Sequence, residues 1–165
     1  MTKNRQLSIF AIGITSIYVL SIMSIQLAAP DKIIEPDDFP LNCPEDSLNC
    51  SMIAPNHYRS DNLTELRFNS SLSKVMGEAI RWIESQPGTE IIGEWPGQTH
   101  SVFRTLMFRF PDDFVVKGFC DNGQAVLHIY SKSRLGISDI GVNKARVLSF
   151  KDHMSNVEMA TLDCV

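Results

Sequence analysis

Residues 125–154, AVLHIYSKSRLGISDIGVNKARVLSFKDHM, hold a strand, a polar connection and a helix in direct succession. Side chains alternate along the strand, which places Ala125, Leu127 and Ile129 on one of its faces. A helix is predicted from Asn143, because an asparagine side chain can cap a helix by accepting a backbone N–H. The connection between the two elements decides how the helix packs on its sheet.

The segments upstream of this unit predict an α+β domain. Residues 64–88 are helical in their second half, and Pro87 and Gly88 end that helix. Its apolar face consists of Leu72, Val75, Met76, Ala79, Ile80 and Ile83. Strand patterns cover residues 89–95, 100–110, 114–119 and 125–133. Such a run of strands between helices favours an antiparallel sheet of about four strands, with helices before and after it.

Turns and face patterns complete this expectation. Asp112 and Asp113, in the sequence FPDDF, are predicted to turn the chain into the third strand, and the Asp-Asn-Gly run at 121–123 to end it. In the second strand, Val102 is expected to share a face with Leu106, Phe108 and Phe110. The second face of the sheet is mixed in character, which suits a groove or a surface that meets water.

The N-terminal residues 1–30 are expected to form a membrane segment, and residues 31–165 the domain. Residues 6–30 carry no formal charge and follow the basic residues Lys3 and Arg5. A membrane span needs about 20 mostly apolar helical residues, and this stretch supplies them. With the two basic residues inside, the positive-inside rule places the domain in the periplasm or an equivalent lumenal space.

Cleavage of this stretch as a signal peptide is the alternative, and it would give a secreted protein. Ala29 would be the small residue before the cleavage site, but Leu27 stands where another small residue is preferred. The apolar run is also longer than the roughly 7–15 residues of a secretory signal. We therefore expect an uncleaved single-pass anchor in the inner membrane.

The charge of the chain argues against nucleic acid as a partner. The net charge is −4 and includes the two basic N-terminal residues, so the domain itself is more acidic still. Nucleic-acid-binding domains are normally basic.

Four cysteines without a Cys-x-x-Cys pair give little support for a zinc or thioredoxin-like site. In an oxidising compartment Cys43 could pair with Cys50, and Cys120 with Cys164. Partly buried free thiols are the alternative, and the spacing of the cysteines does not choose between pairings.

The connection at residues 131–146 is the strongest candidate for a site, and it has two interpretations. In the first it is a structural lock, in which Asp139 bonds to nearby backbone N–H groups or pairs with Arg134 or Arg146. In the second, the start of the helix and the arginines bind a phosphate or carboxylate group. The ligand-binding residues would then be Ser131, Ser133, Arg134, Asp139, Asn143 and Arg146.

Part of this connection resembles a family signature. The run SRLGISDIGVNKARV, residues 133–147, resembles the signature of the family catalogued as domain of unknown function 1499. CPEDSLNC and FPDDF are similar to two further elements of that family, in the same order, so the resemblance covers residues 40–150. It implies an exported or membrane-tethered protein and no particular activity. The matching positions are Ser133, Arg134, Gly136, Asp139, Gly141, Asn143 and Arg146.

A catalytic role has little support. His128 is near Ser131 and Ser133 in sequence, but strand alternation puts the histidine and the two serines on opposite faces. The sequence contains no G-x-S-x-G elbow, H-E-x-x-H helix or P-loop. We expect no cofactor and no metal, and a hydrolase is the weakest alternative.

These observations predict a non-catalytic binding or assembly module of the cell envelope, attached to the membrane by its N-terminal helix. A membrane complex is the first candidate partner. Binding of an anion or a lipid headgroup by residues 131–146 is the alternative.

Overall fold

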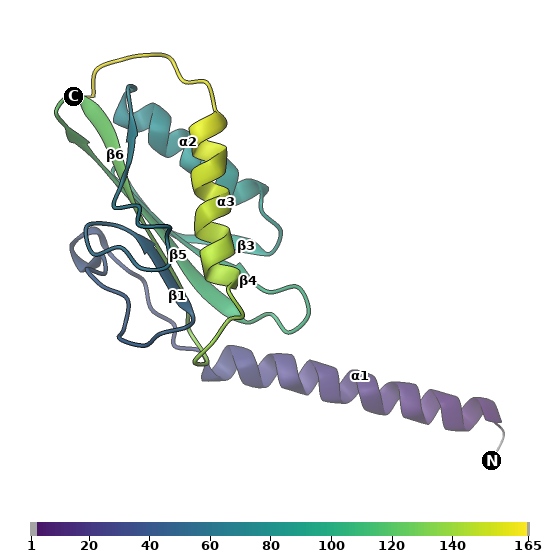
Figure 1. Cartoon of the computed structure of the whole chain (residues 1–165). Helices are drawn as coiled ribbons and strands as arrows, with labels where there is room; N and C mark the ends of the chain where they lie inside the picture. Colours follow the sequence, from purple (N-terminus) through teal and green to yellow (C-terminus); the bar gives the residue numbers. More distant parts are fainter. Residues whose placement is uncertain (1–2, 165) are drawn as a thin grey trace.

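The computed structural model describes residues 3–164, so residues 1–2 of the expected anchor and residue 165 of the domain lie outside the described part. It shows an α+β domain from which one long helix projects (Figure 1). The elements in chain order are α1 (Lys3–Ala28), the 3-10 turn η1 (Pro36–Asp38), β1 (Cys50–Ile53), β2 (Leu66–Phe68), α2 (Leu72–Ser85), β3 (Thr89–Trp95), β4 (Gln98–Arg104), β5 (Pro111–Asp121), β6 (Gln124–Ser133) and α3 (Val142–Asn156).

The strands form one antiparallel sheet in the order β1-β6-β5-β4-β3, and β2 pairs with β6 on the same edge as β1. The predicted α+β class is confirmed, but the sheet has six strands instead of about four. The two additional strands are β1 and β2, of four and three residues. Strands this short carry no alternation pattern of their own, and they form by pairing with the exposed edge of β6.

Helices α2 and α3 cover one face of the sheet (Figure 1). Trp82 of α2 is central to this core, with its ring centroid 5.7 Å from that of Phe114 and 5.1 Å from that of Phe150. The predicted apolar face of α2 is confirmed at Val75, Met76, Ala79 and Ile83, which are buried, while Leu72 and Ile80 are half-buried. The predicted face of β6 is confirmed as well, because Ala125, Leu127 and Ile129 belong to the same cluster.

The chain between β4 and β5 differs from the prediction. β4 ends at Arg104, residues 105–110 form a loop, and Asp112 and Asp113 lie inside β5. The loop closes because the backbone N–H of Thr105 donates to the oxygen of Phe110, whose own N–H donates to Thr105 Oγ1. The apolar alternation expected to continue the strand therefore falls in a loop, and its side chains are exposed.

The second face of the sheet is covered, which corrects the expectation of a groove or a wet surface. The segment that follows α1 lies across it, and Ile34 and Phe39 pack with Met52, Val115 and Tyr130 in a second buried cluster. The sequence shows a mixed face because this covering segment is itself irregular and bonds to polar side chains of the sheet.

Helix α1 is exposed over most of its length. By length and composition Arg5–Ala28 could cross a membrane, with a mean hydropathy of 2.0. Two of its polar side chains contact the loop at residues 105–110: Tyr18 Oη donates to the oxygen of Met107 at 2.6 Å, and Gln26 Nε2 donates to that of Arg109 at 2.7 Å. The loop therefore lies along the C-terminal part of α1.

Two disulfides join the four cysteines. Cys43 is bonded to Cys50, and Cys120 to Cys164, with Cα–Cα distances of 5.9 Å and 5.5 Å. The first ties the covering segment to β1. The second ties the C-terminal segment to the end of β5, where the backbone N–H of Cys164 also donates to the oxygen of Gly123 at 2.9 Å.

We expect His128 to make the domain less stable in mild acid. Its ring packs near those of Phe39 and Phe119, and its burial lowers its pKa below 6.5. The charge of Glu65 opposes this shift, and that of Lys117 adds to it. A histidine with a lowered pKa in the folded state protonates more readily when unfolded, so acidification favours unfolding. Denaturant titrations of the parent and of His128→Phe from about pH 7 to about pH 5 check this. The variant should lose less stability over that range, and equal losses would contradict the assignment.

Candidate functional site

Asn143 is the centre of the candidate site, fully buried in the first turn of α3. Its Nδ2 donates to the backbone oxygen of Asn49 and to Ser133 Oγ, at 3.0 Å each. Its Oδ1 accepts from Ser131 Oγ at 2.5 Å and from a guanidinium N–H of Arg146. The amide therefore uses its donors and its acceptor to join α3 to β6 and to the chain before β1.

Arg146 connects α3 to the central strand β5. Its Nη2 lies 2.9 Å from Asp112 Oδ2, and its guanidinium carbon lies 4.5 Å from the centre of the Phe103 ring. The side chains of Arg146 and Asp112 are 10% and 2% exposed. Buried charges are stable only when they are paired, so this ion pair is part of the packing of α3 on the sheet.

Asp113 forms a second charged group on the opposite face, because successive side chains of a strand point to opposite sides. Its Oδ1 lies 2.8 Å from Arg134 Nη2 and 2.8 Å from His100 Nε2. His100 Nδ1 accepts the backbone N–H of Ile34 at 2.9 Å. Nε2 therefore carries the ring proton and donates it to Asp113.

This second group holds the linker, which we define as residues 30–39 after α1. Arg134 Nη2 donates to the backbone oxygen of Lys32 at 3.1 Å, and Nη1 lies 3.3 Å from Asp31 Oδ1. Gln98 Nε2 donates to the backbone oxygen of Ile34 at 2.8 Å. Together with the bond from Ile34 to His100, these contacts fix the linker on the sheet directly after α1 ends.

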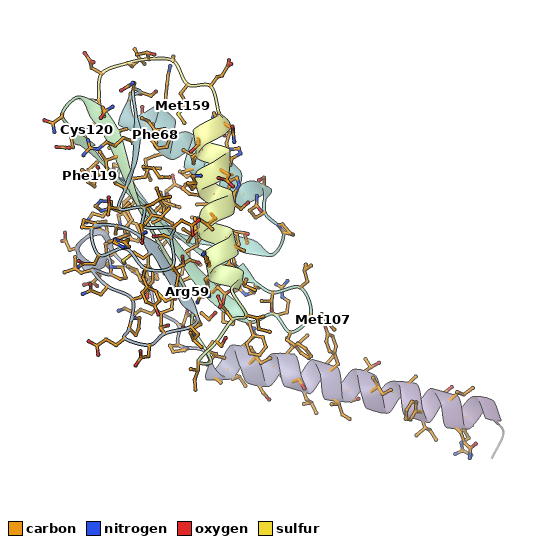
Figure 2. All side chains as sticks on the ribbon, in the orientation of Figure 1. Arg59, Phe68, Met107, Phe119, Cys120 and Met159 are labelled. Atoms are coloured by element: carbon orange, nitrogen blue, oxygen red, sulfur yellow. A yellow bond between two sulfur atoms is a disulfide. The ribbon has the colours of Figure 1, made fainter. Side chains whose placement is uncertain are left out.

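Asp139 caps α3, and Asn143 does not, which corrects the predicted cap. The Asp139 carboxylate accepts the backbone N–H of Gly141 at 2.9 Å and that of Asn143 at 2.6 Å. The ion partner of Asp139 is Arg59, at 3.9 Å, which lies beside the start of α3 (Figure 2). Of the two expected roles of Asp139, bonding to nearby backbone N–H groups is therefore confirmed. Its pairing with Arg134 or Arg146 is not found, because adjacent aspartates of β5 occupy those arginines.

Four of the six predicted site residues lie together on the helix side of the sheet: Ser131, Ser133, Asn143 and Arg146. Arg134 lies on the opposite face, and Asp139 lies in the connecting loop. The sequence interpretation missed Asp112, Asp113, His100 and Asn49 as partners. The signal was present in the pair of adjacent aspartates, which serve both faces once they lie in a strand.

Comparison with known proteins identifies the family. Residues 41–154 match the model of the family described as Protein of unknown function (DUF1499). The chain belongs to this family. The match spans the buried groups around Asn143 and Asp112 and begins after α1 and the linker. No match to a curated protein was found.

A cavity of about 370 Å³ lies next to these DUF1499 signature residues. It opens between the loop at 105–110 and the connection between β6 and α3. Most of its lining is apolar, and its lining residues are Thr105, Phe110, Asp112, Ser133, Leu135, Gly136, Ser138, Asp139, Ile140 and Val142. Seven of these ten residues lie in the signature run 133–147.

The two arginines of the DUF1499 signature are paired within the domain. Arg134 and Arg146 are 8% and 10% exposed, and each has a carboxylate partner. Both ring nitrogens of His100 are occupied, so it has no free base for a reaction. Over residues 3–164, no three His, Cys, Asp or Glu side chains group as metal ligands would.

Proposed function

We propose that this chain is a non-catalytic module of the cell envelope, anchored in the inner membrane by α1 with its domain in the periplasm or an equivalent space. In this proposal it binds or assembles with another component of the envelope. The observation that carries it is the clamped linker. Arg134, His100 and Gln98 hold the first residues after α1, so the domain keeps a fixed position relative to its anchor.

Retention of α1 is favoured over cleavage by its contacts with the domain. Tyr18 and Gln26 bond to the loop at 105–110, and Ser21, Ile22 and Ile25 are partly covered. A cleaved signal peptide would have no need of contacts with the mature domain. The two disulfides support an oxidising compartment for the domain.

The polar side chains of the signature are occupied by contacts within the domain, which supports a non-catalytic role. The polar side chains around Asn143 are bonded to one another, and the adjacent aspartates of β5 neutralise one arginine on each face. A reaction or an anion site would need polar groups that face a substrate.

Lipid contact through residues 131–146 is the second candidate. It is favoured by the position of this connection, which lies beside the C-terminal end of α1, and by the cavity that it borders (Figure 1). Because its arginines are paired, contact with the apolar part of a lipid has more support than contact with an anionic headgroup.

The contacts that hold the linker on the sheet can be removed to test the assembly role. Full-length chain in native membranes is compared with Arg134→Met, which removes the bonds to Asp31 and Lys32 at the start of the linker, and with Lys132→Met, which removes one positive charge from the adjoining strand β6. We expect the parent and Lys132→Met to crosslink into a discrete larger complex in intact membranes. Arg134→Met should stay folded and resist alkaline extraction but lose that complex.

Two results would overturn the proposal. One is release of the parent chain by alkaline extraction with a new N-terminus after Ala29, because the protein would then be secreted. The other is an unchanged crosslinking pattern in Arg134→Met, because assembly would then not depend on the fixed position of the domain.

A further inference from the structure

The domain has a group of exposed apolar side chains at the end that faces α1. Leu106 and Met107 lie in the loop at residues 105–110, here called the first loop, and are 80% and 68% exposed. Ile137 and Ile140 lie in the connection between β6 and α3, here called the second loop, and are 82% and 98% exposed. Met107 projects from the domain toward α1 (Figure 2). Single exposed apolar residues are ordinary, but a contiguous group marks a contact surface.

The position of this surface along α1 indicates what covers it. The first loop bonds to Tyr18 and Gln26, and the Tyr18 ring lies 6.3 Å from that of Phe108. From residue 18 to the end of α1 at Ala28 is about 15 Å along the helix axis. With α1 spanning the membrane and Ala28 at the outer boundary of a hydrocarbon core about 30 Å thick, this distance is half of that thickness, and the loop would lie at the depth of the outer leaflet.

The bonds to α1 also satisfy two carbonyl groups of this loop. In hydrocarbon, an unpaired carbonyl group is costly. The carbonyl groups of Met107 and Arg109 accept from Tyr18 and Gln26, and the N–H of Arg109 donates to Thr105. These partners lower the cost of moving this part of the loop out of water.

The second loop shows backbone strain at its apolar tip. Ile140 has a φ of 56°, in the left-handed region that β-branched residues rarely adopt, and its side chain is almost fully exposed. The cap at Asp139 and the left-handed Gly141 hold it in place. Within the protein this conformation buries no apolar surface, which points to a contact outside the protein.

The cavity between the two loops has the size and lining of a ligand site. Its volume of about 370 Å³ lies in the range of small-molecule pockets. Phe110, Leu135, Ile140 and Val142 supply apolar walls, and the carboxylate of Asp112 in its wall is paired with Arg146. An apolar ligand that enters from the side of the two loops would meet no unpaired charge at Asp112.

We propose that the two loops insert into the outer leaflet beside α1 and that the cavity between them binds an acyl chain of a membrane phospholipid. The inference rests on the proposed anchoring by α1 and extends it, since it gives the domain a lipid ligand. The tip at Leu106, Met107 and Phe108 enters the leaflet. Ile140 and Val142 border the bound chain.

The test uses full-length protein in vesicles of dioleoylphosphatidylcholine, with and without phosphatidylcholine brominated on its acyl chain. Met107→Trp reports on the loop tip, and Leu162→Trp is the control, an exposed apolar position near the C-terminus. We expect bromine on the acyl chain to quench most of the added emission of Met107→Trp and to leave that of Leu162→Trp unchanged. Equal quenching of the two would overturn insertion.

A second pair of variants tests the cavity. Val142→Trp fills it, whereas Ile137→Trp adds the same ring to an exposed position outside its lining. Native mass spectrometry of chain released from the same vesicles should show bound phospholipid on the parent and on Ile137→Trp, and loss of it on Val142→Trp. Equal lipid on both variants would overturn the cavity site. Alkaline extraction of each variant reports on the anchor separately, so failure of anchoring is distinguishable from failure of lipid binding.

Discussion

Replacing Asp112 with alanine should cost about 3–5 kcal/mol of folding free energy, because it leaves the Arg146 guanidinium buried without its charge partner. This is a large share of the roughly 5–15 kcal/mol that stabilises a typical domain. The loss should also loosen the network around Asn143, which accepts a bond from the other terminal nitrogen of the same guanidinium group. Denaturant unfolding of the full chain in detergent measures the effect.

Two control variants distinguish the effect of breaking a buried ion pair from the effect of losing any ion pair. Asp121→Ala lies on the same strand and removes an ion pair with Arg67, but this pair is 40% and 34% exposed, so the cost should stay below about 1 kcal/mol. The double variant Asp112→Leu with Arg146→Met should recover much of the loss, since it leaves no unpaired charge. Equal costs for Asp112→Ala and Asp121→Ala would show that burial of the pair is unimportant.

Removal of the Cys120–Cys164 disulfide, by alanine at both positions, should destabilise the domain by about 4 kcal/mol. The two cysteines are 44 residues apart, and a cross-link stabilises by restricting the unfolded chain, more so for longer loops. The C-terminal segment should also detach, which would expose Met159 and the site of Cys164, both packed on the main core. Denaturant unfolding and limited proteolysis of this segment are the measurements.

The other disulfide provides the matched comparison. Cys43 and Cys50 are 7 residues apart, so alanine at both should cost less, about 2–3 kcal/mol. The Cys43–Cys50 disulfide closes a local loop, whereas the Cys120–Cys164 disulfide joins the C-terminal segment to the central strand β5. A larger loss from the Cys43–Cys50 pair would contradict the dependence on loop length.

Sequence patterns were sufficient to predict a helix or strand where the element was long enough to repeat its hydrophobic pattern. The apolar face of α2 and the alternation of β6 were predictable, because α2 is long and buries one regular face, and β6 is long and presents a regular apolar row to the helices. β1 and β2 were not, since their structure comes from pairing with β6. The apolar run after Arg104 resembled a strand, and only the closing bonds of Thr105 show that it is a loop.

The position of the candidate site was predictable from the sequence, but the hydrogen-bond and ion-pair partners of its residues were not. Ser131, Ser133, Asn143 and Arg146 meet as the strand-to-helix connection indicated. Their acidic partner lies in a strand remote in sequence, and the register that pairs Asp112 with Ser133 is a property of the whole sheet. The role of Asp113 was equally hidden in the sequence. It bonds to Arg134 and His100, and these two residues in turn hold the linker near the N-terminus.

The attachment of the linker to the interior of the sheet has a mechanical consequence. A force that pulls on α1 enters the domain through His100 and Gln98 of β4 and through Arg134 after β6, and Asp113 of β5, the third of the five strands along the sheet path, joins His100 to Arg134. Adjacent Asp112 passes the same load to α3 through Arg146. Tension is therefore shared between the middle of the sheet and its covering helix, and it does not peel off an edge strand one bond at a time.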